Sequence, residues 1–125
     1  MSKISHILLK NPVVVPAGTK LIEAAKLMKK NKISSVLITK NGRIAGIISV
    51  EDIMGRVAAE VSIDIAAEEV MHSPEITIDS DKWLMDAIAM FERCKVSHIA
   101  VIENGEKIGI MRAEDILHTY RFNKE

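Results

Sequence analysis

Apolar residues in this chain alternate between short β-branched stretches and longer stretches with helical spacing. The pattern of the first half predicts a strand, a helix, a pair of strands and a second helix. These predicted elements are Val13–Val15, Thr19–Asn31, Ser35–Thr39, Arg43–Ile48 and Val50–Val61. The paired strands flank Asn41-Gly42, a dipeptide that favours a tight hairpin because both residues tolerate positive φ.

The second half repeats this order. Its predicted elements are Ile76–Ile78, Asp81–Cys94, His98–Glu103, Lys107–Met111 and Ala113–Phe122. Identical residues recur at a constant spacing of 63, as from Gly46 to Gly109. The residues of the first copy that recur in this way are Leu21, Ala24, Lys32, Ser34, Asn41, Gly42, Gly46, Ile47, Glu51, Asp52 and Ile53. The chain is therefore predicted to contain two copies of one unit.

The predicted fold class is α+β, with two pseudo-symmetric β-α-β-β-α repeats packed through their sheets. A three-stranded sheet with two helices buries its apolar face poorly alone, whereas two copies together bury it well. The repeats are predicted at residues 1–61 and 62–125, forming one compact module. Within the bridge Ser62–Met71, Asp64 is placed to cap a short helix, mirrored by Ile4–Leu9 before the first repeat.

Composition and charge exclude several classes of function for this chain. The 125 residues carry 17 basic and 17 acidic side chains, so the chain lacks the broad positive field that nucleic-acid or anionic-membrane binding needs. No apolar run approaches the ~18 residues of a membrane span. A single cysteine excludes an intramolecular disulfide. We therefore expect a cytoplasmic protein with no nucleic-acid or membrane partner.

The candidate chemistry lies where a predicted strand passes into a predicted helix. A helix start favours anions, and there Ser49 offers a hydroxyl while Asp52 offers a carboxylate that can accept hydrogen bonds from a ribose diol. The spacing of the two residues is also close to that of a capping box, and spacing alone favours this structural role. In the second copy Arg112 replaces the serine but Asp115 keeps the aspartate. Retention of the aspartate without its capping partner favours a further role for it.

Four features together carry a family resemblance: the entry Met71-His72-Ser73-Pro74, the Leu-x-x-Ala helix, the Asn-Gly hairpin and the exit Gly-apolar-apolar-x-x-x-Asp. In this order and duplicated, they resemble a tandem pair of CBS domains, the cystathionine-β-synthase type of repeat. The resemblance covers about Lys3 to Tyr120. It implies a stand-alone regulatory module that binds adenosine-containing ligands between its repeats: AMP, ADP or ATP, with S-adenosylmethionine or NAD as alternatives. The resemblance also implies that the module is a homodimer and that it requires no cofactor.

The resemblance assigns roles to individual residues. It implies that Asp52 and Asp115 hold the ribose hydroxyls and that Ser49 holds the α-phosphate. The residues implied to border the base are Val13, Val14, Ser35 and Val36 in the first copy and Ile76, His98 and Ile99 in the second. The sequence departs from the family pattern at Arg112, which either holds further phosphates or fills the second site through an ion pair with Asp115. It departs again in the second strand of each repeat, where the family frequently has a proline but this chain has Leu37 in the first copy and Ala100 in the second.

Other functions have less support from the sequence. His6, His72, His98 and His118 are far apart with no metal-binding spacing, and no nucleophile, base or phosphate-loop motif is present. We therefore predict no enzyme activity and no metal site. The alternative function is a ligand-independent dimeric platform for an unidentified effector protein. The predicted helix Val50–Val61 carries apolar residues that fit either the core or a dimer face.

Overall fold

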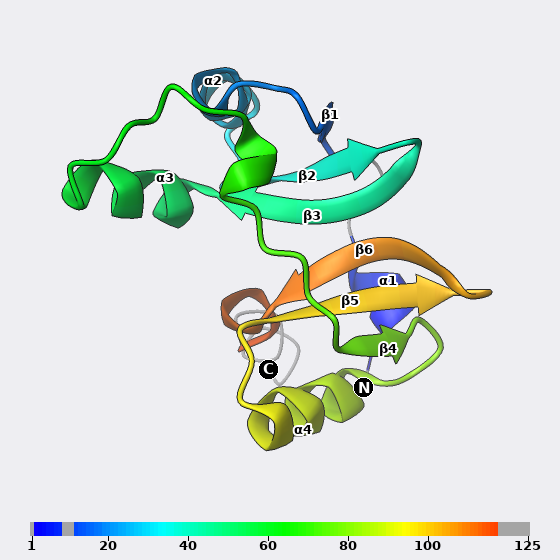
Figure 1. The fold of residues 1–125 in the computed structure, drawn as a ribbon. Coiled ribbons are helices and arrows are strands. Elements are labelled where there is room, and N and C mark those ends of the chain that lie inside the picture. The colour runs from blue at the N-terminus through cyan, green and yellow to red at the C-terminus, as the bar shows by residue number, and fades with distance from the viewer. Residues whose placement is uncertain (1, 9–11, 118–125) are drawn as a thin grey trace. The chain divides into compact units, whose positions relative to one another are not determined.

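The computed structural model describes residues 2–8 and 12–117 (Figure 1). Their contacts divide the chain into two compact units, each built around one three-stranded sheet. Residues 12–73 form the first-repeat unit, whereas residues 2–8 and 74–117 form the second-repeat unit. The mixed fold with two pseudo-symmetric halves, predicted from the repeat, is confirmed.

The first-repeat unit has the sheet order β1-β2-β3. Its elements are β1 (Val14–Pro16), α2 (Leu21–Asn31), β2 (Ser35–Lys40), β3 (Arg43–Ser49), α3 (Val50–Ala58) and the short 3₁₀ helix η1 (Ala67–Glu69). Strands β1 and β2 are parallel and are connected through α2, whereas β2 and β3 form an antiparallel hairpin. The predicted second helix is shorter than expected, since α3 ends at Ala58 and not at Val61.

One face of this sheet packs against α2. The helix buries a stripe of apolar side chains at helical spacing, Leu21, Ala24 and Met28, because these residues lie on one side of it. They form a core with Val36 and Ile38 of β2, among others. Alternation along the strands places Leu37 and its register partner Ile47 on the opposite face. The first-repeat sheet is therefore apolar on both faces.

Both hairpins turn at the predicted Asn-Gly pairs. Asn41 and Gly42 have φ values of 53° and 76°, and Asn104 and Gly105 have values of 52° and 79°. Two consecutive positive φ angles are typical of the type I′ turn, whose twist matches that of the flanking strands. The turn chemistry therefore fixes the register of each hairpin.

The second-repeat unit has the sheet order β4-β5-β6. Its elements are α1 (Ile4–Ile7), β4 (Thr77–Asp79), α4 (Leu84–Cys94), β5 (His98–Glu103) and β6 (Glu106–Arg112). Residues 113–117 are helical and follow β6 directly. The remainder of the helix predicted to reach Phe122 lies outside the described residues.

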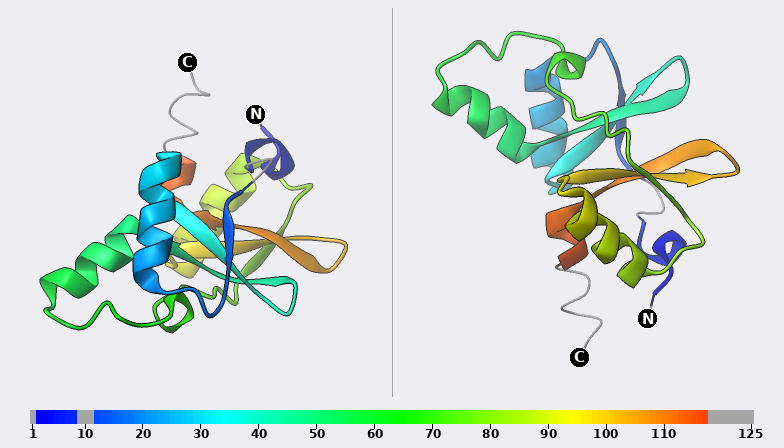
Figure 2. Two further views of the ribbon diagram at one scale, coloured as in Figure 1. Left: turned by 90° about the horizontal axis from the view of Figure 1, so that it is seen from above. Right: turned by 60° about the horizontal axis from the view of Figure 1, so that its bottom comes forward.

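Each unit also contains a short segment that precedes the other repeat in the sequence. The N-terminal helix α1 lies beside the start of α4 (Figure 2). Lys3 forms an isolated bridge with Trp83, and Ile4 is fully buried in the second-repeat core. In the equivalent way, Ala66 forms a bridge with Lys20, and Ala67 is fully buried in the first-repeat core. Each unit thus packs a segment that precedes the other repeat in the sequence. This segment exchange does not test the predicted sequence boundary between residues 61 and 62, which stays a prediction.

The bridge between the repeats differs from its prediction in one detail. The short helix η1 begins after Ala66 and is not capped by Asp64. Instead, Asp64 pairs at 3.2 Å with Lys20, the exposed residue that precedes α2. The Ala66 amide donates to Glu69 of the same helix. No helix in the described part of the chain has the length and apolar character that crossing a membrane requires.

Candidate functional site

The candidate residues of the first copy gather at one end of the first-repeat sheet. Because β1 and β2 are parallel and β3 is antiparallel, the starts of β1 and β2 meet the end of β3 there. Ser35 and Ser49 are direct cross-strand partners at this end. The carbonyl of Val13 accepts a hydrogen bond from the Leu37 amide at 3.0 Å, which joins the approach to β1 to the same edge. The fold thus brings together residues 36 positions apart in the sequence, from Val13 to Ser49.

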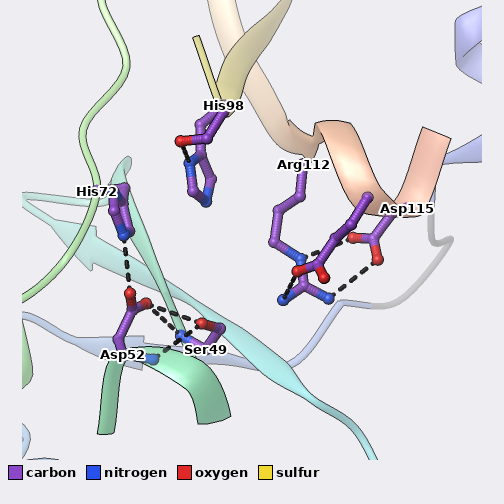
Figure 3. Close-up of polar contacts among 8 residues, drawn as sticks. Ser49, Asp52, His72, His98, Arg112 and Asp115 are labelled. Carbon is purple, nitrogen blue, oxygen red and sulfur yellow. Dashed lines mark hydrogen bonds and ion pairs between the residues drawn. The ribbon is translucent and has the colours of Figure 1, made fainter. Parts of the chain in front are cut away.

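Ser49 and Asp52 form a complete capping box at the start of α3 (Figure 3). The Asp52 amide donates to Ser49 Oγ at 3.3 Å, and the Ser49 amide donates to Asp52 Oδ2 at 2.8 Å. The Ser49 hydroxyl donates to the same oxygen at 2.9 Å. The structural role that the spacing favours is therefore present, and it contributes about 1 kcal/mol to the helix.

His72 also contacts the Asp52 carboxylate, and the sequence did not identify it. Its Nε2 atom lies 2.8 Å from Asp52 Oδ1, the oxygen that Ser49 leaves to other donors (Figure 3). An ionised carboxylate only accepts hydrogen bonds, so the Nε2–H donates. No spacing signal joins these residues, because they are 20 positions apart in the sequence.

These contacts determine the charge state of Asp52. Burial raises the pKa of the Asp52 carboxyl, but hydrogen bonds from His72 and from the amide and hydroxyl of Ser49 oppose it. The hydrogen bonds and the charge of His72 together outweigh the effect of burial, so the pKa of Asp52 is lowered. Asp52 is therefore a half-buried carboxylate that is ionised at neutral pH and oriented by its neighbours.

The backbone of His72 is held against the free edge of β3. The His72 amide donates to the Ile47 carbonyl at 2.9 Å, and the Ile47 amide donates to the His72 carbonyl at 3.0 Å. The Ser73 hydroxyl donates to the Ala45 carbonyl. Gly46 lies beneath this segment, where a β-carbon would be 2.6 Å from Met71 Sδ. Gly46 therefore permits the close approach that places the imidazole beside Asp52.

The second-repeat unit has a different arrangement at the equivalent place. Arg112 is only 6% exposed, and its guanidinium forms two hydrogen bonds with Asp115, from Nε at 2.8 Å and from Nη2 at 3.0 Å (Figure 3). Its Nη1 atom lies 3.1 Å from Glu114 Oε1. Of the two roles that the sequence left open for Arg112, the structure shows the ion pair with Asp115. This carboxylate is thus engaged by a cation of its own unit.

The other candidate residues divide into surface and core positions. Val14 is exposed, Val13 and Ile76 are partly buried, and His98 is partly buried with its Nδ1 atom 2.7 Å from Ser97 Oγ. Val36 and Ile99 belong to the hydrophobic cores of their units, so their side chains contact neighbouring core residues. Any ligand contact at those two positions would involve the backbone. Among residues 2–8 and 12–117, no group of three His, Cys, Asp or Glu side chains is placed to hold a metal ion.

Comparison with known proteins identifies the family. The CBS domain model matches the chain twice, at residues 4–59 and 67–121. The chain belongs to the CBS domain family. Among curated proteins, the uncharacterized protein MJ1232 of Methanocaldococcus jannaschii is 29% identical over 116 residues. That alignment covers 92% of this chain but only 38% of the relative, so this CBS pair matches a part of a longer protein.

Two solved CBS structures with bound ligands resemble this chain. The CBS domain protein PAE2072 from Pyrobaculum aerophilum, in complex with AMP, has a TM-score of 0.73 and 25% identity, covering 97% of this chain and 99% of that one. The CBS domain pair of protein MJ0100, in complex with 5′-methylthioadenosine and S-adenosyl-L-methionine, has a TM-score of 0.74 and 25% identity, covering 98% of both chains. All three ligands contain adenosine.

Proposed function

We propose that this CBS pair is a regulatory module that binds an adenosine-containing ligand where Ser49 and Asp52 lie. The observation that carries the proposal is the half-buried Asp52 carboxylate, ionised and oriented at the start of α3. AMP, 5′-methylthioadenosine and S-adenosylmethionine differ at the 5′ position but share a ribose with vicinal hydroxyls. A carboxylate is the side chain that accepts two hydrogen bonds from such a diol.

We propose one set of contacts for each group of the ligand. The ribose hydroxyls donate to Asp52, while the adenine lies near Val13, Val14 and Ser35. A 5′-phosphate is received by the positive end of α3 beside Ser49, whose hydroxyl stays bonded to Asp52. AMP, ADP and ATP fit this description, as do S-adenosylmethionine and NAD. The module needs no further cofactor.

We propose that the second-repeat position is closed to the same ligand. There the guanidinium of Arg112 occupies the Asp115 carboxylate through both oxygens, and the arginine is almost fully buried. A ribose diol would have to separate a bidentate ion pair before it could bind, and it carries no charge to replace the cation. Each chain therefore binds one ligand, at the first-repeat position.

The ligand signal is passed to an effector, and the module itself has no enzyme activity. The effector is either a separate protein or a further domain, since the chain spans 38% of its M. jannaschii relative. The cytoplasmic location stays a prediction. The function is tested by calorimetric titration with AMP, ATP, S-adenosylmethionine and NAD. Saturable binding of one of them supports the proposal, whereas no binding of any at millimolar concentration contradicts it.

A second function, a dimeric interaction platform, is favoured by the surface of α3. This helix has no fully buried residue, and its Met54 and Val57 side chains are 63% and 59% exposed. Between α2 and α3 lies an apolar groove lined by Ala25, Met28, Lys29, Lys32, Ile33, Val50, Ile53 and Met54. We propose that a second copy of the chain covers this surface, because exposed apolar patches of this kind mark protein contacts.

The ligand-binding module and the ligand-independent platform are distinguished by comparing the wild type with a variant that lacks both aspartates. A pull-down partner that the Asp52→Ala/Asp115→Ala double variant retains as well as the wild type supports the ligand-independent platform. Loss of the partner in that variant supports the ligand-dependent module. The oligomeric state is measured by light scattering on the wild type and on Met54→Lys, which places a charge on the exposed face of α3.

A further inference from the structure

The Asp52 carboxylate has few acceptor positions left for a ligand. Among the described residues, Oδ2 accepts hydrogen bonds from the amide and the hydroxyl of Ser49, and Oδ1 accepts one from His72. A carboxylate has about four lone-pair positions, two on each oxygen, so about one remains, on Oδ1. A ribose that donates through both hydroxyls needs two positions. One of the present donors must therefore leave when such a ligand binds.

The donors differ in how readily they leave. The Ser49 amide and hydroxyl belong to the capping box, in which the hydroxyl also accepts from the Asp52 amide, and Ser49 is only 5% exposed. Removing either donor would leave a buried polar group without its partner at the start of α3. The imidazole of His72 comes from outside the helix, and its side chain is 43% exposed. Water can replace its lost hydrogen bond, so His72 leaves at the lowest cost.

We propose that His72 competes with the ribose for Asp52, so that ligand binding displaces the imidazole from Oδ1. This inference rests on the proposed function, to which it adds a residue that restrains the affinity of the site. In the free protein, the imidazole keeps the carboxylate oriented and its hydrogen bonding satisfied. In the bound protein, the two ribose hydroxyls occupy Oδ1 and the side chain of His72 turns to solvent.

The displacement involves the side chain alone. The backbone of His72 is paired with Ile47 through two hydrogen bonds that do not depend on the imidazole. Replacement of His72 therefore leaves the segment attached to β3 and the fold intact. This separation makes His72→Ala a direct probe of the competition.

The test measures the affinity of purified protein for AMP and for 2′-deoxy-AMP by calorimetry. We expect His72→Ala to bind AMP about fivefold more tightly than the wild type, because the ligand no longer displaces a hydrogen bond. His72→Gln, which keeps a neutral donor, should lie between the two. For 2′-deoxy-AMP, which donates only one hydrogen bond from the ribose, the variants should differ little. His6→Ala, which removes an exposed imidazole on α1, is the matched control and should behave as the wild type.

A second measurement follows the imidazole itself. The ring resonances of His72 should move on saturation with AMP, whereas those of His6 should not. If the wild type binds AMP but His72→Ala binds it equally or more weakly, the competition is disproved and the proposed function stands. If only His72→Ala binds, the competition is supported in an extreme form. If neither binds, both proposals are overturned.

Discussion

A β-carbon on Gly46 would lie 2.8 Å from the carbonyl oxygen of His72. This closeness joins two parts of the first-repeat unit that are 26 positions apart in the sequence. It also explains why a strand position next to Ile47 has no side chain. The segment carrying His72 lies directly on β3, and a methyl group at Gly46 would force the two apart.

Gly46→Ala should therefore destabilise the first-repeat unit by about 1–3 kcal/mol, the usual cost of overpacking. The matched control is Gly109→Ala in the second repeat, where the described atoms nearest to the added carbon belong to the Leu8 side chain, at 3.3 Å or more. A leucine side chain adjusts by a few tenths of an ångström, so this variant should lose less. Urea unfolding of both variants measures the difference. Equal losses would show that contact with the His72 segment is unimportant for stability.

Ser49→Ala should lower the stability of the first-repeat unit by about 1 kcal/mol, because it removes the acceptor for the Asp52 amide and one donor to the carboxylate. Urea unfolding of the ligand-free protein isolates this effect from ligand binding. Ser5→Ala, the same change at an exposed position of α1, serves as the control. An unchanged midpoint for Ser49→Ala would mean that the capping box contributes no net stability.

The lowered pKa of Asp52 predicts a pH dependence of stability. A carboxyl whose pKa is lower in the folded state stabilises the fold above its unfolded pKa of about 3.9, and this contribution is lost as the pH falls through the folded value. Asp52→Asn should thus be less stable than the wild type at pH 7, with a gap that narrows as the pH falls below the unfolded pKa of about 3.9. Unfolding free energies of both proteins across this range measure the gap. A gap that stays constant would contradict the assignment.

Arg112→Ser should open the second-repeat position to ligand. The substitution removes the ion pair with Asp115 and recreates the Ser-x-x-Asp spacing of Ser49 and Asp52. Calorimetry should then show a stoichiometry near two ligands per chain, in place of one for the wild type. Arg112→Lys retains a cation beside Asp115 and is the control. Two sites in the wild type would show that Arg112 does not close the second position.

Local chemistry made much of the fold predictable from the sequence. The Asn-Gly turns and the amphipathic stripe of α2 depend on neighbouring positions, and the repeat of 63 residues presents the same local patterns twice. The structure confirms all three features. The Ser49–Asp52 pair was recognisable because a capping box has a fixed spacing. The end of α3 was less predictable, since the apolar residues after Ala58 continue the helical pattern without forming helix.

The contact between His72 and Asp52 depends on tertiary structure and was not predictable. His72 reaches Asp52 only because its segment pairs with β3, and no spacing in the sequence encodes that pairing. The segment exchange that buries Ile4 and Ala67 is equally remote from local pattern. For Arg112, the sequence left two roles open, and the side-chain geometry shows the ion pair with Asp115 that one of them requires.

If the Asp52 carboxylate holds the ribose of an adenosine-containing ligand, as we claim, AMP titration should distinguish two matched alanine variants. Asp52→Ala should weaken binding by at least about tenfold, because it removes the charged acceptor of the diol. Asp115→Ala, the same change at the equivalent position of the second repeat, should leave the affinity near that of the wild type. Equal affinities for Asp52→Ala and the wild type, or a loss confined to Asp115→Ala, would contradict the claim.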